Sequence, residues 1–169
     1  KIMERKSDYK GIIGVVADII HVSKEYEIAI ETALGGSISN IVTDNEQTAK
    51  SMIQFLKKNR FGRATFLPLT SIRGRRAENA DRICGEEGVI GLASDLIRVD
   101  SQFGHLADYL LGRVFIVDHI DHALALAKKY RYSLRIVTLE GESLNPGGSL
   151  SGGAYKNTGN LLGRHREME

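Results

Sequence analysis

The chain contains two copies of one segment, and this repeat constrains its fold more than any other feature. Residues 11–22 read GIIGVVADIIHV and residues 88–99 read GVIGLASDLIRV, and the two align without a gap at a spacing of 77 positions. Six of the twelve aligned pairs are identical, and most of the others exchange one apolar residue for another. The spacing is far too long for a solenoid repeat, so the pattern indicates duplication of a whole subdomain.

The register continues beyond the repeated segment into matching sets of elements. Ser23 and Asp100, both favourable helix N-cap residues, precede segments that end together at Leu34-Gly35 and Leu111-Gly112, which predicts an amphipathic helix with a glycine C-cap in each half. A β-branched strand, a second helix and a closing strand follow in each half. Their ranges are 37–43, 47–59 and 63–69 in the first half, and 113–118, 121–130 and 133–141 in the second.

Each half therefore reads as an initial turn, a helix, a strand, a helix and a strand. The strand-helix-strand part is a crossover, which favours parallel neighbouring strands. We expect a mixed α/β (α+β) fold with internal pseudo-twofold symmetry, in which subdomain one covers about 10–72 and subdomain two about 88–157. The segment 73–87 is polar and has few apolar residues at useful spacing, so we expect a linker there.

Composition and charge exclude several classes of protein. The net charge of +2 comes from 23 basic and 21 acidic side chains, far from the balance of a dedicated nucleic-acid binder, so any DNA contact must use a local patch. The single cysteine, Cys84, excludes a disulfide framework or a zinc site of several thiolates, and fits a reducing compartment such as the cytoplasm. Because no apolar run approaches the roughly 18 residues of a membrane span, we expect no membrane partner.

The second half continues into a glycine-rich stretch, SLNPGGSLSGGAYKN at 143–157, which the first half lacks. Two glycine pairs alternate there with small residues. Three interpretations are open: a hairpin and surface loop, a phosphate-binding loop, or a strand edge where missing side chains let a partner's backbone approach. The phosphate loop fits poorly because neither pair is followed by Lys and the G-x-G-x-x-G pattern is absent.

Five ordered blocks, GIIGVVADII, AIETALGG, GRATFLPL, RIVTLEGE and NPGGSLSGG, make nearly the whole chain similar to the hinge of bacterial structural-maintenance-of-chromosomes (SMC) proteins. The resemblance implies the hinge fold over 10–157 and a homodimer that joins two coiled-coil arms, with ATPase heads at their far ends. It implies a role in chromosome condensation and segregation, a nucleoid-associated place in the cytoplasm, and accessory condensin subunits as partners of the full-length protein.

The same resemblance implies where the dimer contact lies. It is placed at or beside the glycine stretch, at Gly147, Gly148, Ser149, Leu150, Ser151, Gly152 and Gly153. The charged ends, 1–9 and 158–169, resemble stubs of the coiled-coil arms, and frayed termini are the alternative for both.

No pattern commits the chain to catalysis. DHIDH at 118–122 suggests a metal site, but Asp118 or Asp121 fits a helix N-cap and the first half carries TDNEQ there, so we expect no metal and no cofactor. Asp18 and Asp95 recur at one position of the two halves, which indicates a turn or cap bond made twice. We expect no enzyme here; the alternative is a small-ligand- or nucleotide-binding enzyme domain that uses 147–153.

Basic residues predict a weak contact with DNA. The candidates are Lys57, Lys58, Arg60, Arg63 and Lys156. Lys57 and Lys58 also offset the helix macrodipole, so stabilisation of the helix end is their alternative role. We expect binding that is independent of sequence, weakens steeply with salt and is helped by dimerisation, which doubles the local patch.

Overall fold

A computed structural model of the chain describes residues 11–154. The first half contains β1 (Ile12–Val15), α1 (Val16–Ile19), β2 (His21–Val22), α2 (Glu27–Leu34), β3 (Ile41–Thr43), α3 (Glu46–Lys58) and β4 (Phe66–Pro68). The second contains α4 (Ala80–Cys84), β5 (Val89–Leu92), β6 (Ile97–Arg98), α5 (Gly104–Leu111), β7 (Val114–Val117), α6 (Ile120–Lys129), β8 (Arg135–Thr138), β9 (Ser143–Leu144) and β10 (Leu150–Ser151).

Short 3-10 helices complete the pattern and strengthen the match between the halves. They cover Lys24–Tyr26 and Gly35–Ser39 in the first half, and Ala93–Asp95 and Ser101–Phe103 in the second. The predicted N-cap residues Ser23 and Asp100 stand before the 3-10 turns that lead into α2 and α5, but neither side chain makes a capping hydrogen bond.

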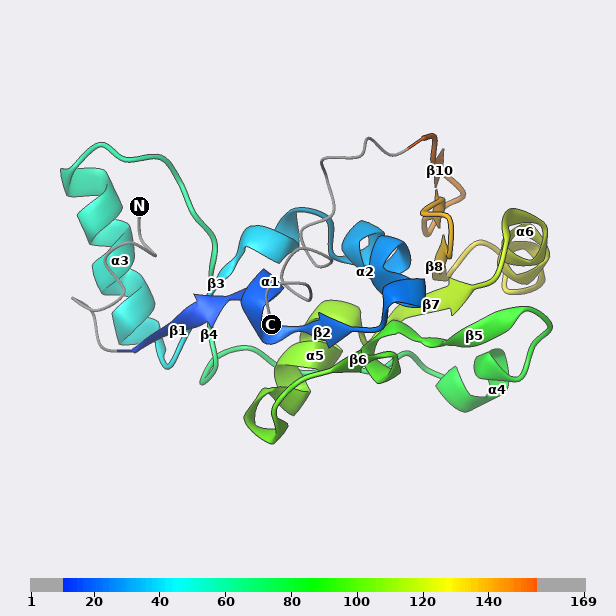
Figure 1. Cartoon of the computed structure of the whole chain (residues 1–169), viewed down its shortest axis with the longest axis horizontal. Coiled ribbons are helices and arrows are strands. Elements are labelled where there is room, and N and C mark those ends of the chain that lie inside the picture. The colour runs from blue at the N-terminus through cyan, green and yellow to red at the C-terminus, as the bar shows by residue number, and fades with distance from the viewer. Residues whose placement is uncertain (1–10, 155–169) are drawn as a thin grey trace.

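The molecule is elongated (Figure 1). Helix α3 and a three-stranded sheet of order β1-β3-β4 occupy one end, while α4, α6 and a five-stranded sheet of order β10-β9-β8-β7-β5 occupy the other. Strands β2 and β6 lie between them with α1, α2 and α5. The described part of the chain has no helix that is both long and apolar enough to cross a membrane.

Equivalent strands pair in the same way in both halves. Strand β1 runs antiparallel to β3, as β5 does to β7. In both pairs the pairing register shifts at the same position of the repeat, between Ile12 and Gly14 in β1 and between Val89 and Gly91 in β5. The helix α3 connects β3 to a parallel β4, and α6 connects β7 to a parallel β8. The predicted crossovers are therefore confirmed.

A two-stranded ribbon joins the halves at their centre. Strands β2 and β6 pair antiparallel with His21 opposite Arg98. These two residues are the same position of the repeat, 77 positions apart. The pseudo-twofold axis that the duplication predicts therefore passes between them.

The halves also share a hydrophobic core. Ile30 of α2 and Leu106 of α5 are both fully buried in one central cluster that draws on both repeats. A second cluster, around Phe115 of β7, belongs to the second half, and a small third cluster, around Met52 of α3, belongs to the first. Neither half covers its inner face without the other, so the chain forms one folded body.

Three local expectations were wrong. The initial turn of each half contains a strand, β1 or β5, because Gly14 and Gly91 fit an extended chain as well as a turn. The predicted strand at 37–43 begins only at Ile41, after a 3-10 helix. The segment 73–87, expected to be a polar linker, contains α4, whose Ile83 is 1% exposed and sits in the core of the second half.

Candidate dimer interface

The glycine stretch folds as a hairpin that extends the five-stranded sheet. Strand β10 runs antiparallel to β9, with Leu150 opposite Leu144. Between them the amide of Gly148 donates to the Asn145 carbonyl at 2.9 Å, and the Asn145 amide donates to the Ser149 carbonyl at 2.9 Å. The hairpin interpretation therefore holds for the first glycine pair.

Backbone conformation explains those two glycines. Gly147 and Gly148 have φ of +94° and +108°, which L-residues rarely adopt. A Cβ on Gly147 would meet nothing within 4 Å, so steric room inside one chain does not require a glycine there. Neither of them begins a helix, so within the described residues they do not form the phosphate-binding arrangement of the enzyme alternative.

The outer side of β10 is an open edge. It is the last strand of its sheet among the described residues, and Leu150 is 58% exposed. Gly152 and Gly153 follow directly and are also exposed. An edge strand with unpaired backbone groups and an exposed large apolar side chain is suited to pairing with another chain.

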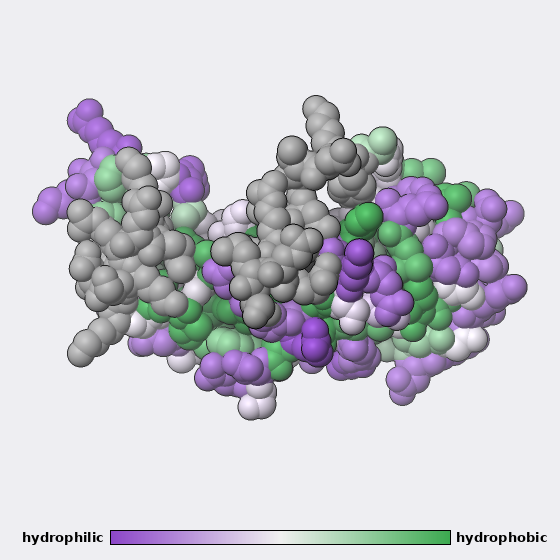
Figure 2. All heavy atoms as spheres, viewed as in Figure 1, coloured by the Kyte–Doolittle hydropathy of each residue, from purple (hydrophilic) through white to green (hydrophobic). Residues whose placement is uncertain are grey.

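An apolar groove adjoins this edge. It has a volume of about 360 Å³, and its lining includes Leu124, Tyr132, Leu144 and Leu150 together with the first glycine pair. Leu124 and Tyr132 are 41% and 46% exposed. Hydrophobic atoms reach the surface between hydrophilic ones at this end of the molecule (Figure 2). Sequence reasoning missed Leu124 and Tyr132, because each is a single apolar residue without a pattern of its own.

The first half has an uncovered counterpart of this region. In the second half, β9 pairs with β8, whereas the equivalent β4 is an edge strand among the described residues. A groove of about 500 Å³ lies beside it, lined in part by Ile53, Phe66 and Pro68. Ile53 is 45% exposed. The hairpin β9–β10 thus covers in one half a surface that the other half leaves open.

The predicted basic residues lie next to that open surface. Lys57 and Lys58 form the last turn of α3, and Arg60 and Arg63 follow in the loop to β4; all four side chains are exposed. Lys57 also lines the groove beside Ile53. Lys156 lies outside the described residues.

Asp95 has a structural partner that the repeat did not predict. Its two carboxylate oxygens accept hydrogen bonds from the Arg76 guanidinium at 2.9 and 2.8 Å, and these bonds lower the pKa of Asp95. Arg76 also lies 3.5 Å from the Asp108 carboxylate. The pair fastens the segment before α4 to the second half, so the expected turn or cap bond at Asp95 is wrong.

Cys84 carries no sign of a nucleophile. Burial is the main cause that raises the pKa of its thiol, and it is partly buried at the end of α4. A raised pKa keeps the sulfur in its protonated, weakly nucleophilic form at neutral pH.

The expected N-cap at 118–121 is replaced by a different arrangement. Residue His119 occupies the N-cap position of α6 without a capping side-chain bond, and Asp118 accepts from the His119 amide at 2.7 Å. In the first half, the Asn45 side chain caps α3 by accepting from the Thr48 amide at 3.0 Å.

Together these features define a class: a duplicated α/β domain with an unpaired strand edge beside a groove in each half, an arrangement suited to binding another protein chain. The family model for the flexible hinge domain of SMC proteins matches residues 9–127. The chain belongs to this SMC hinge family, as the resemblance predicted.

Curated relatives agree with the family. The chain is similar to the chromosome partition protein Smc of Bacillus subtilis (strain 168), with 45% identity over 172 residues that cover 100% of this chain and 14% of that protein. The Smc protein of Clostridium kluyveri (strain NBRC 12016) is 44% identical over 156 residues, which cover 92% of this chain and 13% of the relative. The chain thus spans about one seventh of these relatives.

Solved structures confirm the mixed α/β fold. An asymmetric dimer of the Geobacillus stearothermophilus SMC hinge domain matches with a TM-score of 0.91 and 38% identity, covering 99% of this chain and 68% of that one. The Pyrococcus furiosus SMC hinge domain matches with a TM-score of 0.76 and 31% identity, covering 94% and 81%. The family is that of a hinge region, and no finding favours the enzyme alternative.

Proposed function

We propose that this chain is the homodimerisation hinge of a chromosome partition protein, where it joins two coiled-coil arms into a V or ring. The observation that carries the proposal is the open edge of β10 beside its apolar groove. The Geobacillus relative, which crystallised as an asymmetric dimer, supports the same role.

In the proposed dimer, β10 of one subunit pairs with the open β4 edge of its partner. The internal repeat supports this pairing. Strands β4 and β8 are equivalent, and β8 pairs with β9 whereas β4 has no strand on that side among the described residues. Two equivalent contacts then close a twofold ring, in which the β10 and β4 edges of each subunit are both paired. Since β10 and β4 are only 2 and 3 residues long, apolar side chains such as Leu150 and Ile53 contribute much of the contact.

Sedimentation of the purified chain at a series of concentrations tests the dimer. Each chain has a mass of 18.6 kDa, so the expected species is twice that mass, with dissociation only on dilution. Velocity and equilibrium runs should agree on this mass. A species of one chain mass across the whole series would overturn the proposal.

The second proposed partner is DNA, held weakly through Lys57, Lys58, Arg60 and Arg63. Their exposure at one end of the molecule supports this contact. The double variant Lys57→Ala/Lys58→Ala should bind duplex DNA more weakly and should reduce the slope of log K against log salt by about 2 for each subunit that contacts the DNA, because two phosphate contacts per subunit are removed. Fluorescence anisotropy over a salt series measures both quantities.

The second half offers a matched control for that experiment. Lys128 and Arg131 are exposed cations at and just after the end of α6, the helix equivalent to α3. Lys128→Ala/Arg131→Ala removes the same charge and should leave the salt slope unchanged. Equal slopes for the wild type and the α3 variant would refute the assigned DNA surface.

The remaining proposals concern the full-length protein. We infer ATPase heads at the far ends of the arms, accessory condensin subunits as partners, and a nucleoid-associated place in the cytoplasm. Membership of the SMC hinge family supports all three. The arm stubs at 1–9 and 158–169 lie outside the described residues.

A further inference from the structure

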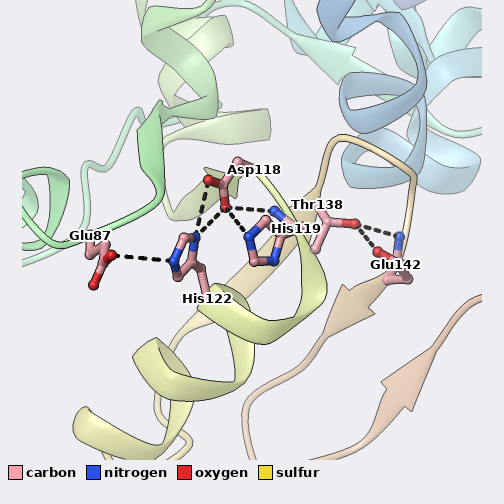
Figure 3. Close-up of polar contacts among 6 residues, drawn as sticks. All are labelled: Glu87, Asp118, His119, His122, Thr138 and Glu142. Carbon is pink, nitrogen blue, oxygen red and sulfur yellow. Dashed lines mark hydrogen bonds and ion pairs between the residues drawn. The ribbon is translucent and has the colours of Figure 1, made fainter.

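Two histidines and two carboxylates gather where β7 meets α6 (Figure 3). Asp118 follows β7, His119 and His122 stand at the start of α6, and Glu87 comes from the segment before β5. One ligand atom each from Asp118, His119 and His122 lies within 4.8 Å of the others. The proposed dimer surface does not use this cluster.

The ring of His122 is fixed in its orientation. Its Nδ1 lies 2.8 Å from Asp118 Oδ1, and the ring packs on Gly88, where an added Cβ would come within 2.4 Å of Nδ1. A carboxylate that accepts from Nδ1–H holds the neutral imidazole in the tautomer whose Nε2 lone pair is free. A carboxylate bonded to the other ring nitrogen in this way is the usual support of a metal-binding histidine.

The free Nε2 of His122 faces a second ligand. It lies 3.6 Å from Glu87 Oε1, which is long for a hydrogen bond. Two donors that bind one tetrahedral ion at about 2.0–2.1 Å are roughly 3.3 Å apart. The separation therefore suits a shared ion better than a direct hydrogen bond.

His119 can supply a third donor. Its ring stacks on that of His122, with centroids 4.2 Å apart, and its side chain is 50% exposed. The half-exposed ring can leave this stacked position by changing its rotamer, and the site requires it to turn a nitrogen toward the space between His122 and Glu87. The positive end of the α6 dipole opposes a cation here, and the carboxylates of Asp118, Glu87 and Asp121 offset it.

The first half shows that folding does not require the imidazoles. Asp44 accepts from the Asn45 amide and from Thr48 Oγ1 at 2.7 Å each, so it links β3 to the first turn of α3 as Asp118 links β7 to α6. Gly11, like Gly88, has a positive φ, and it packs on the side chains of Asp44 and Thr48. The second half keeps the carboxylate and replaces Asn45 and Thr48 by histidines.

From this geometry we propose that His122, His119 and Glu87 bind one first-row divalent metal ion that favours imidazole, such as Zn²⁺, with Asp118 orienting His122. A water completes the tetrahedral set. The site departs from the expectation, based on sequence, that 118–122 only begins a helix. It does not depend on dimerisation, because all four residues come from one chain.

Titration of the tag-free full chain with Zn²⁺ tests the site, with Co²⁺ absorption as a second probe of tetrahedral coordination. We expect one ion per chain. His122→Gln should weaken binding by about 100-fold or more, and Asp118→Asn by about 10- to 100-fold. Glu87→Gln, at a side chain that is 88% exposed, should weaken it about tenfold without disturbing the fold.

One control variant and two possible results decide whether the metal site exists. His21→Gln removes an imidazole of β2 and should leave the affinity unchanged. The proposal is overturned if the wild type takes up no ion at about 1 mM, the weak end of specific binding. It is equally overturned if folded His122→Gln and Glu87→Gln bind as the wild type does. In either case the cluster is an imidazole held between carboxylates.

Discussion

Replacing Gly112 by alanine is expected to lower the free energy of unfolding by about 3 kcal/mol, although the backbone there suits any residue. Gly112 has φ of −71°, yet a Cβ would lie 1.9 Å from the Arg75 carbonyl oxygen and 2.4 Å from that of Asp108. The Ala77 amide donates to the Gly112 carbonyl at 2.7 Å, so the segment before α4 must move and stretch this bond. Chemical denaturation followed by circular dichroism measures the loss.

Gly35 is the matched control, because it stands at the same place after α2. Its φ is +55°, and a Cβ there would meet nothing within 4 Å. Gly35→Ala should therefore cost only backbone strain, about 1–3 kcal/mol, because φ +55° with ψ −132° lies outside the left-handed helical region and is adopted mainly by glycine. A smaller loss at Gly112 than at Gly35 would mean that the contact with Arg75 relaxes easily.

These two glycines show how far the repeat could predict the structure. Both were predicted as helix C-caps from one sequence signal. Only Gly35 uses the conformational freedom of glycine, while Gly112 is needed for a close approach of distant backbone. Sequence alone identifies the position, because the repeat aligns it. The reason for the glycine depends on Arg75, 37 residues earlier, which only the fold brings near.

Local patterns predicted the elements that depend on local order. Helices α3 and α6 and the parallel crossovers followed from helical spacing and short β-branched runs. In the segment 47–59, helical spacing groups Ile53 with the apolar residues Met52 and Leu56, yet the structure exposes 45% of Ile53. Helical spacing could not distinguish Ile53 from buried Met52, because both are apolar and adjacent in the helix. Which of them is buried depends on how the rest of the chain packs against the helix.

The interface at 147–153 stays a prediction, and the structure changes the reason for it. The glycine pairs were expected to make room for a second backbone, but Gly147 and Gly148 are explained by the positive φ of a hairpin turn. Exposure of Leu150 and the open β10 edge are properties of the sheet order. No spacing in the sequence encodes which strand ends a sheet, so that part required the structure.

The variant Leu150→Lys is expected to convert the proposed dimer into a folded monomer, raising the dissociation constant by about 100-fold or more. A charged side chain on an edge strand opposes strand addition, since pairing would bury the ammonium group against an apolar surface. Leu150 is 58% exposed in the single chain, so its replacement should leave the melting temperature of the monomer nearly unchanged. Sedimentation gives the mass, and circular dichroism confirms the fold.

Two further variants locate both sides of that contact. Gln102→Lys adds the same charge in an exposed 3-10 helix away from both sheet edges and should remain dimeric. Ile53→Lys alters the open surface beside β4 and should dissociate the dimer as Leu150→Lys does, because each would change one side of the same contact. A dimeric Ile53→Lys beside a monomeric Leu150→Lys would keep β10 in the interface and reject β4 as its partner. Dimers from all three would remove β10 from the interface altogether.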